Sequence, residues 1–384
     1  MKVITCPPPK KINAKAVLTL VGTLFVSAVL LMLPDTAIDY MKKGLLLCAH
    51  SLIPSLFPFM IISEIIVSCG IGQFISRPLS PVFKRLFGIG DAGTCATVIG
   101  LLCGFPIGAR CAASLHDRGE MSTSELERTL MICNNASPAF VISTVGAAIM
   151  GDLRIGIVIY VCLVLSSLTV SLFAGMFMKK AELFPSLKRS LPSALGAKAF
   201  TDAVKNSVLS MLSVCAFILI FSTVVGCVTE LISKAGVPDT VLCFISGFFE
   251  LSGGAVSASR LDGTLMRATA SALFCSWSGL CVHFQIISAA GGRGASFTPY
   301  FVAKAIQGIL CAALCAVCLK FIFPDLLLND AQVFVPTDTP PSATGTYVCL
   351  AFVLASSIPF SVYLFTKKRR ISSKKVIDKR SPLC

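Results

Sequence analysis

Charged residues are scarce in this sequence: 14% of its 384 residues are Asp, Glu, Lys or Arg, whereas 55% are hydrophobic. A soluble globular domain carries about 25% charged residues, so this composition excludes a soluble protein with a charged surface. Apolar segments follow one another along nearly the whole chain, which leaves no room for a sizeable soluble domain. The composition therefore predicts an all-α polytopic membrane protein.

Motifs of several enzyme classes are also absent. The sequence contains no HExxH zinc motif, no P-loop and no dinucleotide fingerprint. The GxGD stretch formed by Gly88, Gly90 and Asp91 lacks the second intramembrane Asp of an aspartyl protease, and Ser276 stands where a rhomboid serine motif requires Gly. We therefore expect no enzymatic activity and no cofactor.

The 18 cysteines suggest neither disulfides nor a metal centre, because they are scattered through apolar segments. The one CxxC pair, Cys315 and Cys318, lies inside an expected helix without a His partner. We expect small, reduced core residues. The first apolar run lacks a small-x-small cleavage site, so it is expected to remain as a transmembrane helix.

The net charge of +14 is carried by loops and by the two ends of the chain, as in the C-terminal stretch "KKRRISSKKVIDKR". This distribution is typical of membrane topology signals and of contacts with anionic lipid, rather than of nucleic-acid binding. The expected partners are therefore membrane lipid and no nucleic acid.

Ten apolar segments are candidates for crossing the membrane, which takes about 20 residues. They are 16–33, 44–70, 92–116, 127–150, 155–178, 205–233, 238–259, 267–290, 299–323 and 344–366. If all crossed, the basic connector 181–204 would lie outside, against the positive-inside rule. If 92–116 and 238–259 are re-entrant hairpins, the connector and both termini are cytoplasmic and the Lys- and Arg-free stretch 324–343 lies outside. We therefore expect about eight crossings and two hairpins.

Both expected hairpins carry helix-breaking residues at mid-length, in "GLLCGFPIGARCAASL" and "GFFELSGGAVSASRL". A straight membrane helix rarely contains such a break. A kinked spanning helix, whose small residues allow close helix packing, is the alternative that the sequence leaves open.

The breaks recur in the same order in two halves, each of which reads as helix, hairpin, broken helix and helix. Each half then crosses an odd number of times, so the halves form an inverted repeat, which is typical of secondary transporters. The expected divisions are an N-terminal tail and first transmembrane helix (1–40), a first repeat (41–180), a basic cytoplasmic connector (181–204), a second repeat (205–325), and an extracytoplasmic loop, last transmembrane helix and basic cytoplasmic tail (326–384).

The first broken helix is expected at "CNNASPAF". Pro138 cannot donate a backbone hydrogen bond and clashes with the preceding turn, so the helix loses regular bonding around Asn134. Backbone of this kind is tolerated in a membrane where protein or a cavity satisfies it. We expect Asn134, Asn135 and Ser137 to bind a cation or polar substrate; cross-linking of neighbouring helices by the Asn amides is the alternative.

Ionisable residues in apolar segments are further candidates. Glu64 is either functional or paired with a polar neighbour near the cytoplasmic end, and Glu250 either binds a coupling cation or caps its break. Arg110, directly after "GFPIGA", either attracts a dicarboxylate or snorkels toward a helix end. Lys304 lies one turn into its segment and is expected to reach the membrane interface, and His283 is expected to be structural.

Three stretches, "LFPFMIISEII", "GFPIGAR" and "LERTLMICNNASPAFV", resemble the YlbJ-type membrane proteins of spore-forming bacteria. These proteins carry the nucleoside recognition, or Gate, domain shared with concentrative nucleoside transporters, and the resemblance covers about 40–325. It implies a multi-pass transporter that exports dipicolinate from the mother cell toward the forespore across the outer forespore membrane. A nucleoside or nucleobase transporter and a sporulation membrane scaffold without transport are the alternatives.

The expected substrate site combines the two hairpin tips with the two breaks. Its residues are Gly104, Phe105, Pro106, Gly108, Arg110, Asn134, Asn135, Ser137, Pro138, Glu250, Ser252, Gly253, Gly254, Ser276, Ser278 and Gly279. The first-half residues other than Arg110 match motifs of the resembled family. Arg110 is included because it directly follows "GFPIGA", and the second-half residues are assigned by position alone. The expected ligand is a small anion; a coupling cation, Na⁺ or H⁺, and a homo-oligomer are left open.

Overall fold

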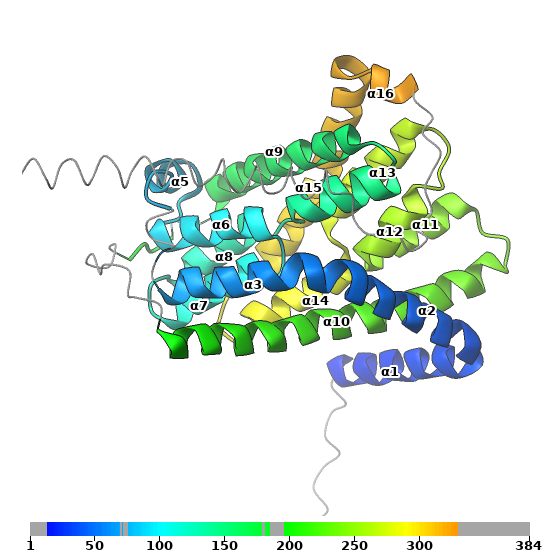
Figure 1. The fold of residues 1–384 in the computed structure, drawn as a ribbon, viewed down its shortest axis with the longest axis horizontal. Helices are drawn as coiled ribbons and strands as arrows, with labels where there is room; N and C mark the ends of the chain where they lie inside the picture. The colour runs from blue at the N-terminus through cyan, green and yellow to red at the C-terminus, as the bar shows by residue number, and fades with distance from the viewer. Residues whose placement is uncertain (1–13, 70, 72–75, 179–180, 185–195, 329–384) are drawn as a thin grey trace, which may run out of the picture.

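The computed structural model describes residues 14–69, 71, 76–178, 181–184 and 196–328. These residues form helices joined by turns, and no strand occurs among them (Figure 1). The all-α prediction is therefore confirmed. The start of the chain at 1–13, much of the connector 181–204, the apolar segment 344–366 and the basic tail lie outside the described residues.

Among the described residues, four helical stretches are long and apolar enough to cross a membrane. They are α9 (Leu153–Phe177), α10 (Ala197–Ser233), α13 with α14 (Thr264–Ala290), and α15 with its π-helical end η3 (Thr298–Ile322). Two bent pairs would raise the number to six if each were one span: Leu20–Met32 with Pro34–His50, and Ser80–Phe87 with Asp91–Cys103. The chain is a polytopic membrane protein, and the count of about eight crossings stays a prediction.

The segment 92–116 forms two short helices, α6 (Asp91–Cys103) and α7 (Ile107–Asp117). They fold back on each other, because a Cβ built on Gly100 would lie 3.1 Å from the Cα of Gly108. In one continuous helix these two positions would be about 12 Å apart. This pair, hairpin 1, turns at Gly104, whose φ of +80° suits glycine.

The segment 238–259 forms a second pair, α11 (Asp239–Phe249) and α12 (Leu251–Ala258), with Glu250 between them. Gly247 and Gly254 touch through their backbones, so these helices also fold back on each other. The pair is hairpin 2. Hairpin 1 lies in the left part of Figure 1 and hairpin 2 in the right part, so the two hairpins approach from opposite ends of the molecule. Two hairpins, rather than two kinked helices, therefore account for these segments.

Two interrupted helices follow the hairpins. The first consists of α8 (Thr123–Cys133) and the π-helix η2 (Ala139–Ile149), separated by the stretch 134–138. The second consists of α13 (Thr264–Trp277) and α14 (Gly279–Ala290), with Ser278 at a φ of +77° between them. Ser278 is the one non-glycine residue with positive φ within the described residues. Both breaks therefore fall where the sequence predicted them.

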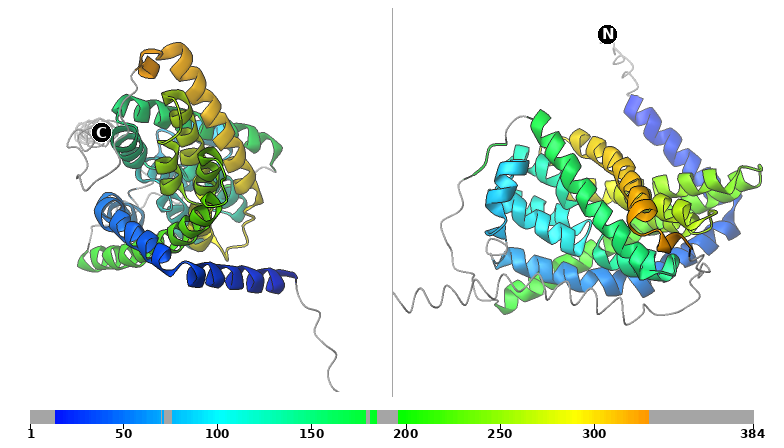
Figure 2. Two further views of the ribbon diagram at one scale, coloured as in Figure 1. Left: turned by 90° about the vertical axis from the view of Figure 1, so that its right-hand side faces the viewer. Right: turned by 90° about the horizontal axis from the view of Figure 1, so that it is seen from above.

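The structure describes further helices besides these four units and the long helices α9 and α10. They are α1 (Ala14–Met32), α2 (Pro34–Leu47), η1 (Cys48–Leu52), α3 (Ile53–Ser68), α5 (Ser80–Phe87), α15 (Thr298–Val317), η3 (Cys318–Ile322) and α16 (Asp325–Leu328). The long helix α10 packs along α2 and α3, where Gly44 lies against Leu219 and Gly226 lies against the ring of Tyr40. Helix α1 projects away from the other helices (Figure 2).

Two hydrophobic cores divide the molecule. The first core joins hairpin 1 and α8 to α14, which is the second part of the other broken helix. The second core joins hairpin 2 and α13 to η2 and α9. Each broken helix therefore contributes one part to each core. Phe105, at the tip of hairpin 1, packs against both cores and lies at the boundary between them.

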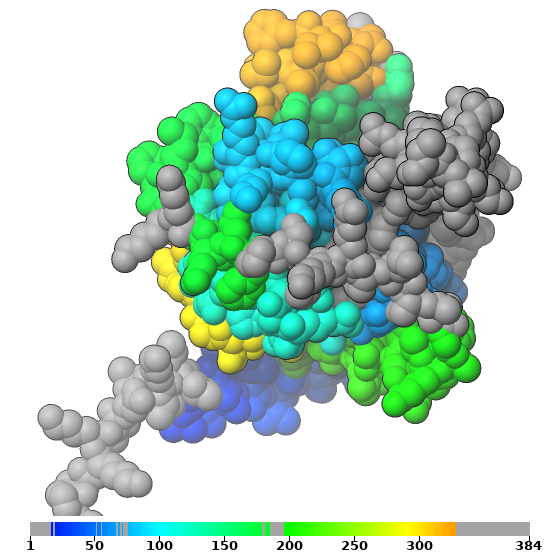
Figure 3. All heavy atoms as spheres, turned by 90° about the vertical axis from the view of Figure 1, so that its left-hand side faces the viewer, coloured from blue at the N-terminus to red at the C-terminus, as the bar shows by residue number. Residues whose placement is uncertain are grey.

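The first turns of α10, which follow the basic connector that the sequence predicts to be cytoplasmic, lie at one end of the molecule. Figure 3 shows α5, the loop after α7 and the first turns of α10 together on this face. The pairing of these loops on one face agrees with the expected topology, although the side of the membrane that they face stays a prediction.

Candidate functional site

The tip of hairpin 1 contacts the first break directly. The backbone N–H of Phe105 donates a 2.9 Å hydrogen bond to the carbonyl of Asn135. Gly104 lies so close to Ser137 that an added Cβ would be 2.8 Å from the Ser137 nitrogen. Four residues of the expected first-half site, Gly104, Phe105, Asn135 and Ser137, are thus brought together.

The last carbonyl of α8, that of Cys133, lies between two glycines of hairpin 1. A Cβ added to Gly100 or to Gly108 would collide with the carbonyl oxygen of Cys133. Small residues let helix backbones approach this closely in membranes. The start of the break therefore packs directly against the backbone of hairpin 1. This contact explains why the motif has a glycine at position 108.

The residues beside the tip and the break have local roles as well. Pro106 is buried at the start of α7, where its carbonyl accepts a 3.0 Å bond from the N–H of Arg110. Pro138 starts η2, and the Ser137 hydroxyl accepts a 3.2 Å bond from the N–H of Phe140. Both prolines thus open the helix that follows the interruption.

The two adjacent asparagines differ. Both are fully buried. Asn134 donates from Nδ2 to the carbonyl of Leu130 at 2.7 Å, and its Oδ1 has no hydrogen-bond partner. Asn135 donates from Nδ2 to the carbonyl of Ile132 at 2.8 Å and to the Ser167 hydroxyl at 3.1 Å. Asn135 therefore cross-links helices, the role stated as the alternative for both, whereas Asn134 keeps a free acceptor.

Lys304 also contacts the first break, although its position in the sequence predicted a side chain at the membrane interface. Its side chain is fully buried, not directed to the membrane interface. Its Nζ donates to Asn135 Oδ1 at 3.1 Å and to Gln307 Oε1 at 2.8 Å. The spacing of Lys304 and Gln307 on one face of an apolar helix was the available signal, since an intramembrane lysine is functional by default.

At the second tip, Glu250 caps its own hairpin. Its carboxylate accepts bonds from the N–H groups of Ser252 at 2.8 Å and Gly253 at 2.6 Å. Glu250 is buried, and its backbone lies against Gly279 at the second break. The structure therefore brings together Glu250, Ser252, Gly253 and Gly279. The contacts of Glu250 are those of a helix cap.

The other expected second-half residues support this arrangement. Gly254 lies against Gly247 within hairpin 2. Ser276 and Ser278 are fully buried in the second break, where the Ser278 hydroxyl lies 3.5 Å from the Ser276 carbonyl. Each hairpin tip thus contacts the break of its own half.

Arg110 lies away from the break and lines a cavity of about 220 Å³ between α3, α7, α10 and α14. The cavity runs along α7 from Ile107, next to the tip, to Asp117 at the end of the helix. Glu64 lies on its wall and accepts a 3.1 Å bond from Asn206. The Ser207 hydroxyl, also on the wall, is buried without a hydrogen-bond partner. The cavity is therefore a polar route from one end of the molecule toward the first tip.

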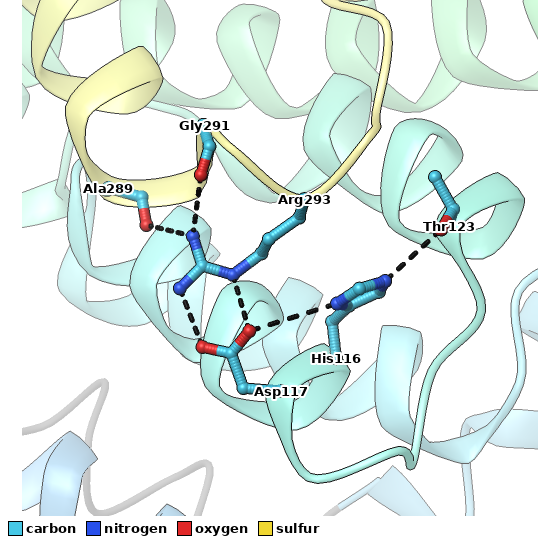
Figure 4. A network of polar contacts seen from close by, with 6 residues as sticks. All are labelled: His116, Asp117, Thr123, Ala289, Gly291 and Arg293. Atoms are coloured by element: carbon cyan, nitrogen blue, oxygen red, sulfur yellow. Dashed lines mark hydrogen bonds and ion pairs between the residues drawn. The ribbon is translucent and has the colours of Figure 1, made fainter.

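An ion pair stands at the outer end of this cavity (Figure 4). Arg293, in the loop after α14, donates to both carboxylate oxygens of Asp117, from Nε at 2.7 Å and from Nη2 at 2.6 Å. These bonds hold the pKa of the Asp117 carboxyl below its usual value. Arg293 also donates to the carbonyls of Ala289 and Gly291. The pair ties hairpin 1 to the second broken helix.

The described residues contain no cluster of three or more His, Cys, Asp or Glu side chains that would hold a metal ion. The cysteines described are free, including Cys315 and Cys318. The site offers backbone groups, the Asn134 and Asn135 amides and the Arg110 guanidinium for binding.

Comparison with known proteins places the first tip and break inside a recognised domain. Residues 49–153 match the Gate family, which is described as nucleoside recognition. The chain is similar to the sporulation integral membrane protein YlbJ of Bacillus subtilis (strain 168), with 27% identity over 75% of this chain and 79% of that protein. No solved structure matches the chain. These matches confirm the resemblance that the motifs indicated.

Proposed function

We propose that this chain is a transporter of a small anionic solute, and not an enzyme, which works by alternating access at its two broken helices. One observation carries the proposal. Each broken helix rests on the tip of a hairpin, and the hairpins enter from opposite ends of the molecule. Secondary transporters bind their substrates at paired breaks of this kind.

The division into two cores suggests which parts move. Each core holds one hairpin, and the broken helices pass from one core to the other. A shift between the cores would bend the broken helices at 134–138 and at Ser278, where regular helical bonding is already interrupted. The cavity along α7 supplies the route from one end to the first tip.

The first half is better suited than the second to attract an anion. The N-terminus of α7 lies at the inner end of the cavity, and Arg110 lies on the cavity wall. A helix N-terminus stabilises an anion by about 0.3–1 kcal/mol when exposed and up to about 2 kcal/mol when partly buried. At the second tip, Glu250 already occupies the N-terminus of α12. The solute's carboxylates would therefore be held from the side of hairpin 1.

The name of the B. subtilis relative connects that protein to sporulation. We propose that this chain exports dipicolinate from the mother cell toward the forespore, in the outer forespore membrane and with both termini in the cytoplasm. Dipicolinate is small and carries two carboxylates, which fits a narrow polar cavity with Arg110 on its wall; the second lining arginine, Arg293, is already bonded to Asp117. The Gate description favours a nucleoside as the second candidate substrate.

The test is uptake of labelled dipicolinate and of labelled nucleosides by proteoliposomes, run side by side with the wild type and two arginine variants. Arg110→Gln should lower dipicolinate flux about tenfold, equivalent to about 1.4 kcal/mol. Arg154→Gln removes the same charge from a residue outside the cavity, which pairs with Asp152 and Asp325. This control should leave the flux within about twofold, or 0.4 kcal/mol.

The pattern of uptake separates the candidates. Flux of dipicolinate with sensitivity to Arg110→Gln supports the proposal, and flux of nucleosides alone makes the chain a nucleoside transporter. Absence of flux for every solute, with the protein folded in the vesicles, would favour the membrane scaffold.

A further inference from the structure

The buried ammonium of Lys304 has an unusual set of partners. Its Nζ lies 3.1 Å from Asn135 Oδ1 and 2.8 Å from Gln307 Oε1. Gln307 Nε2 also donates to Asn135 Oδ1 at 2.8 Å, and Ser167 holds the opposite side of the Asn135 amide at 3.1 Å. The ammonium is therefore held by two amide oxygens that are themselves fixed in place.

No carboxylate forms an ion pair with Lys304 within the part of the chain that the structure describes. The titratable groups on which its charge acts are the thiols of Cys133 and Cys311 and the imidazole of His283. These groups lie on α8, α15 and α14. Helix α9 contributes the Ser167 hydroxyl, bonded to the Asn135 amide, and the Leu163 carbonyl, which accepts a 3.4 Å bond from Gln307 Nε2. None of these neighbours is a fixed negative charge.

Burying an ammonium carries a large desolvation cost. Hydrogen bonds to a charged group are stronger than those between neutral groups, so the two amide oxygens offset part of this cost. The arrangement makes sense if the positive charge has a task, because a methionine would fill the same space without the penalty.

The location of the ammonium indicates that task. Asn135 is part of the first break, and its backbone carbonyl holds the tip of hairpin 1 through Phe105. Lys304 and Gln307 come from α15, in the second half of the chain. Amide oxygens are also the ligands that hard metal cations take in proteins.

We propose that the Lys304 ammonium is a built-in cation, which occupies the amide-oxygen cage of Asn135 and Gln307 in place of a metal ion. The positive charge holds the first break against α15 without any cation from solution. The consequence for transport, which rests on the proposed function, is flux that needs no sodium.

Thermal unfolding of the purified protein in detergent tests the cage without any substrate. Wild type, Lys304→Ala and Lys304→Met are each compared in sodium, methylammonium and N-methylglucamine chloride of equal ionic strength. Lys304→Ala empties the cage, so sodium or methylammonium should raise its Tm by about 2–4 °C over N-methylglucamine. Lys304→Met keeps the cage filled with an uncharged side chain, so it should respond to neither cation, like the wild type.

Two results would overturn the proposal: a wild type that gains stability from sodium, or a folded Lys304→Ala variant that gains none from either cation. If Lys304→Ala does not fold, the wild type still tests the proposal. Its Tm should be the same in sodium as in N-methylglucamine, and a higher Tm in sodium would contradict the proposal.

Flux measurements address the consequence for transport. Wild-type dipicolinate uptake should be the same, within about twofold, with sodium or with N-methylglucamine outside. A tenfold dependence on sodium would contradict the built-in cation, whereas absence of flux under every condition would contradict only the proposed function. The unfolding series therefore stands independently of the transport assay.

Discussion

The two hairpins share a design but differ at their tips. The tip of hairpin 1 is uncharged and hydrogen-bonds through Phe105 to the first break. The tip of hairpin 2 carries Glu250, which turns back and binds the N–H groups of its own helix. The comparison teaches that a repeated order of elements does not imply two equal half-sites. The first half leaves the start of α7 next to the cavity, whereas the second half closes the start of α12 itself.

The largest expected effect concerns the glycine contacts. Gly100→Ala places a methyl group against the Cys133 carbonyl, which is backbone and yields little, whereas Gly247→Ala meets the ring of Phe274. Overpacking costs about 1–3 kcal/mol or more. We expect a larger fall in Tm for Gly100→Ala than for Gly247→Ala, measured by thermal unfolding in detergent. Gly22→Ala, whose Cβ meets nothing within 4 Å, is the control. Equal losses at Gly100 and Gly247 would show that the two hairpins are packed alike.

The second prediction separates the adjacent asparagines at the first break. Asn135→Ala leaves Lys304 with one of its two acceptors, and an unsatisfied buried polar group costs about 1–3 kcal/mol, more when charged. Asn134→Ala removes one local bond, from Nδ2 to the Leu130 carbonyl, and none at Oδ1, so it should destabilise by about 1 kcal/mol and less than Asn135→Ala. In transport assays, Asn134→Ala should lower dipicolinate flux at near-normal membrane abundance. A greater loss of stability for Asn134→Ala than for Asn135→Ala would contradict the assignment.

A third change tests whether Glu250 is a cap. Loss of an N-terminal cap costs about 0.5–2 kcal/mol. Glu250→Ala should therefore lower the free energy of unfolding by this amount, while Glu250→Asp should recover part of the loss. Neither substitution should change the sodium dependence of flux. A variant of Glu250 that stays fully stable but loses transport would instead make the second tip a binding site like the first.

The smallest expected effect is at the ion pair between Asp117 and Arg293, since such partly exposed pairs contribute about 0–1 kcal/mol. The folded-state pKa of Asp117 is lowered by Arg293. The pair therefore stabilises the protein above the unfolded pKa, near 3.9, and this contribution disappears as the pH falls through the lowered folded value. Tm measured from pH 7 to pH 3 should fall slightly more for the wild type than for Asp117→Asn. Parallel curves would indicate that the pair contributes no stability.

Much of the fold was predictable because it depends on local sequence. Gly104 and Pro138 lie in short motifs with several helix-breaking residues, and the placement of Lys and Arg favoured hairpins at 92–116 and 238–259. The matching order of breaks in the two halves also came from the sequence alone.

The partners of the site residues were not predictable, because they depend on contacts between distant parts of the chain. Lys304 lies near the start of its helix, a position typical of an interfacial lysine, yet its partner Asn135 is 169 residues away. Arg110 follows the tip motif directly, but helical geometry turns it toward a cavity shared with α3, α10 and α14. Side-chain spacing within one segment carries no information of this kind.

The bonds between the two halves also set an order of events during synthesis. The amide of Asn135 enters the membrane with the first half, but Lys304 follows 169 residues later. At a ribosomal rate of about 5–20 residues per second, this interval is roughly 8–34 seconds. During that time the first break is in contact with hairpin 1 but lacks the Lys304 ammonium. Asp117 likewise lacks its partner Arg293, which follows 176 residues later. The newly made first half therefore lacks both of these bonds until the second half has been synthesised.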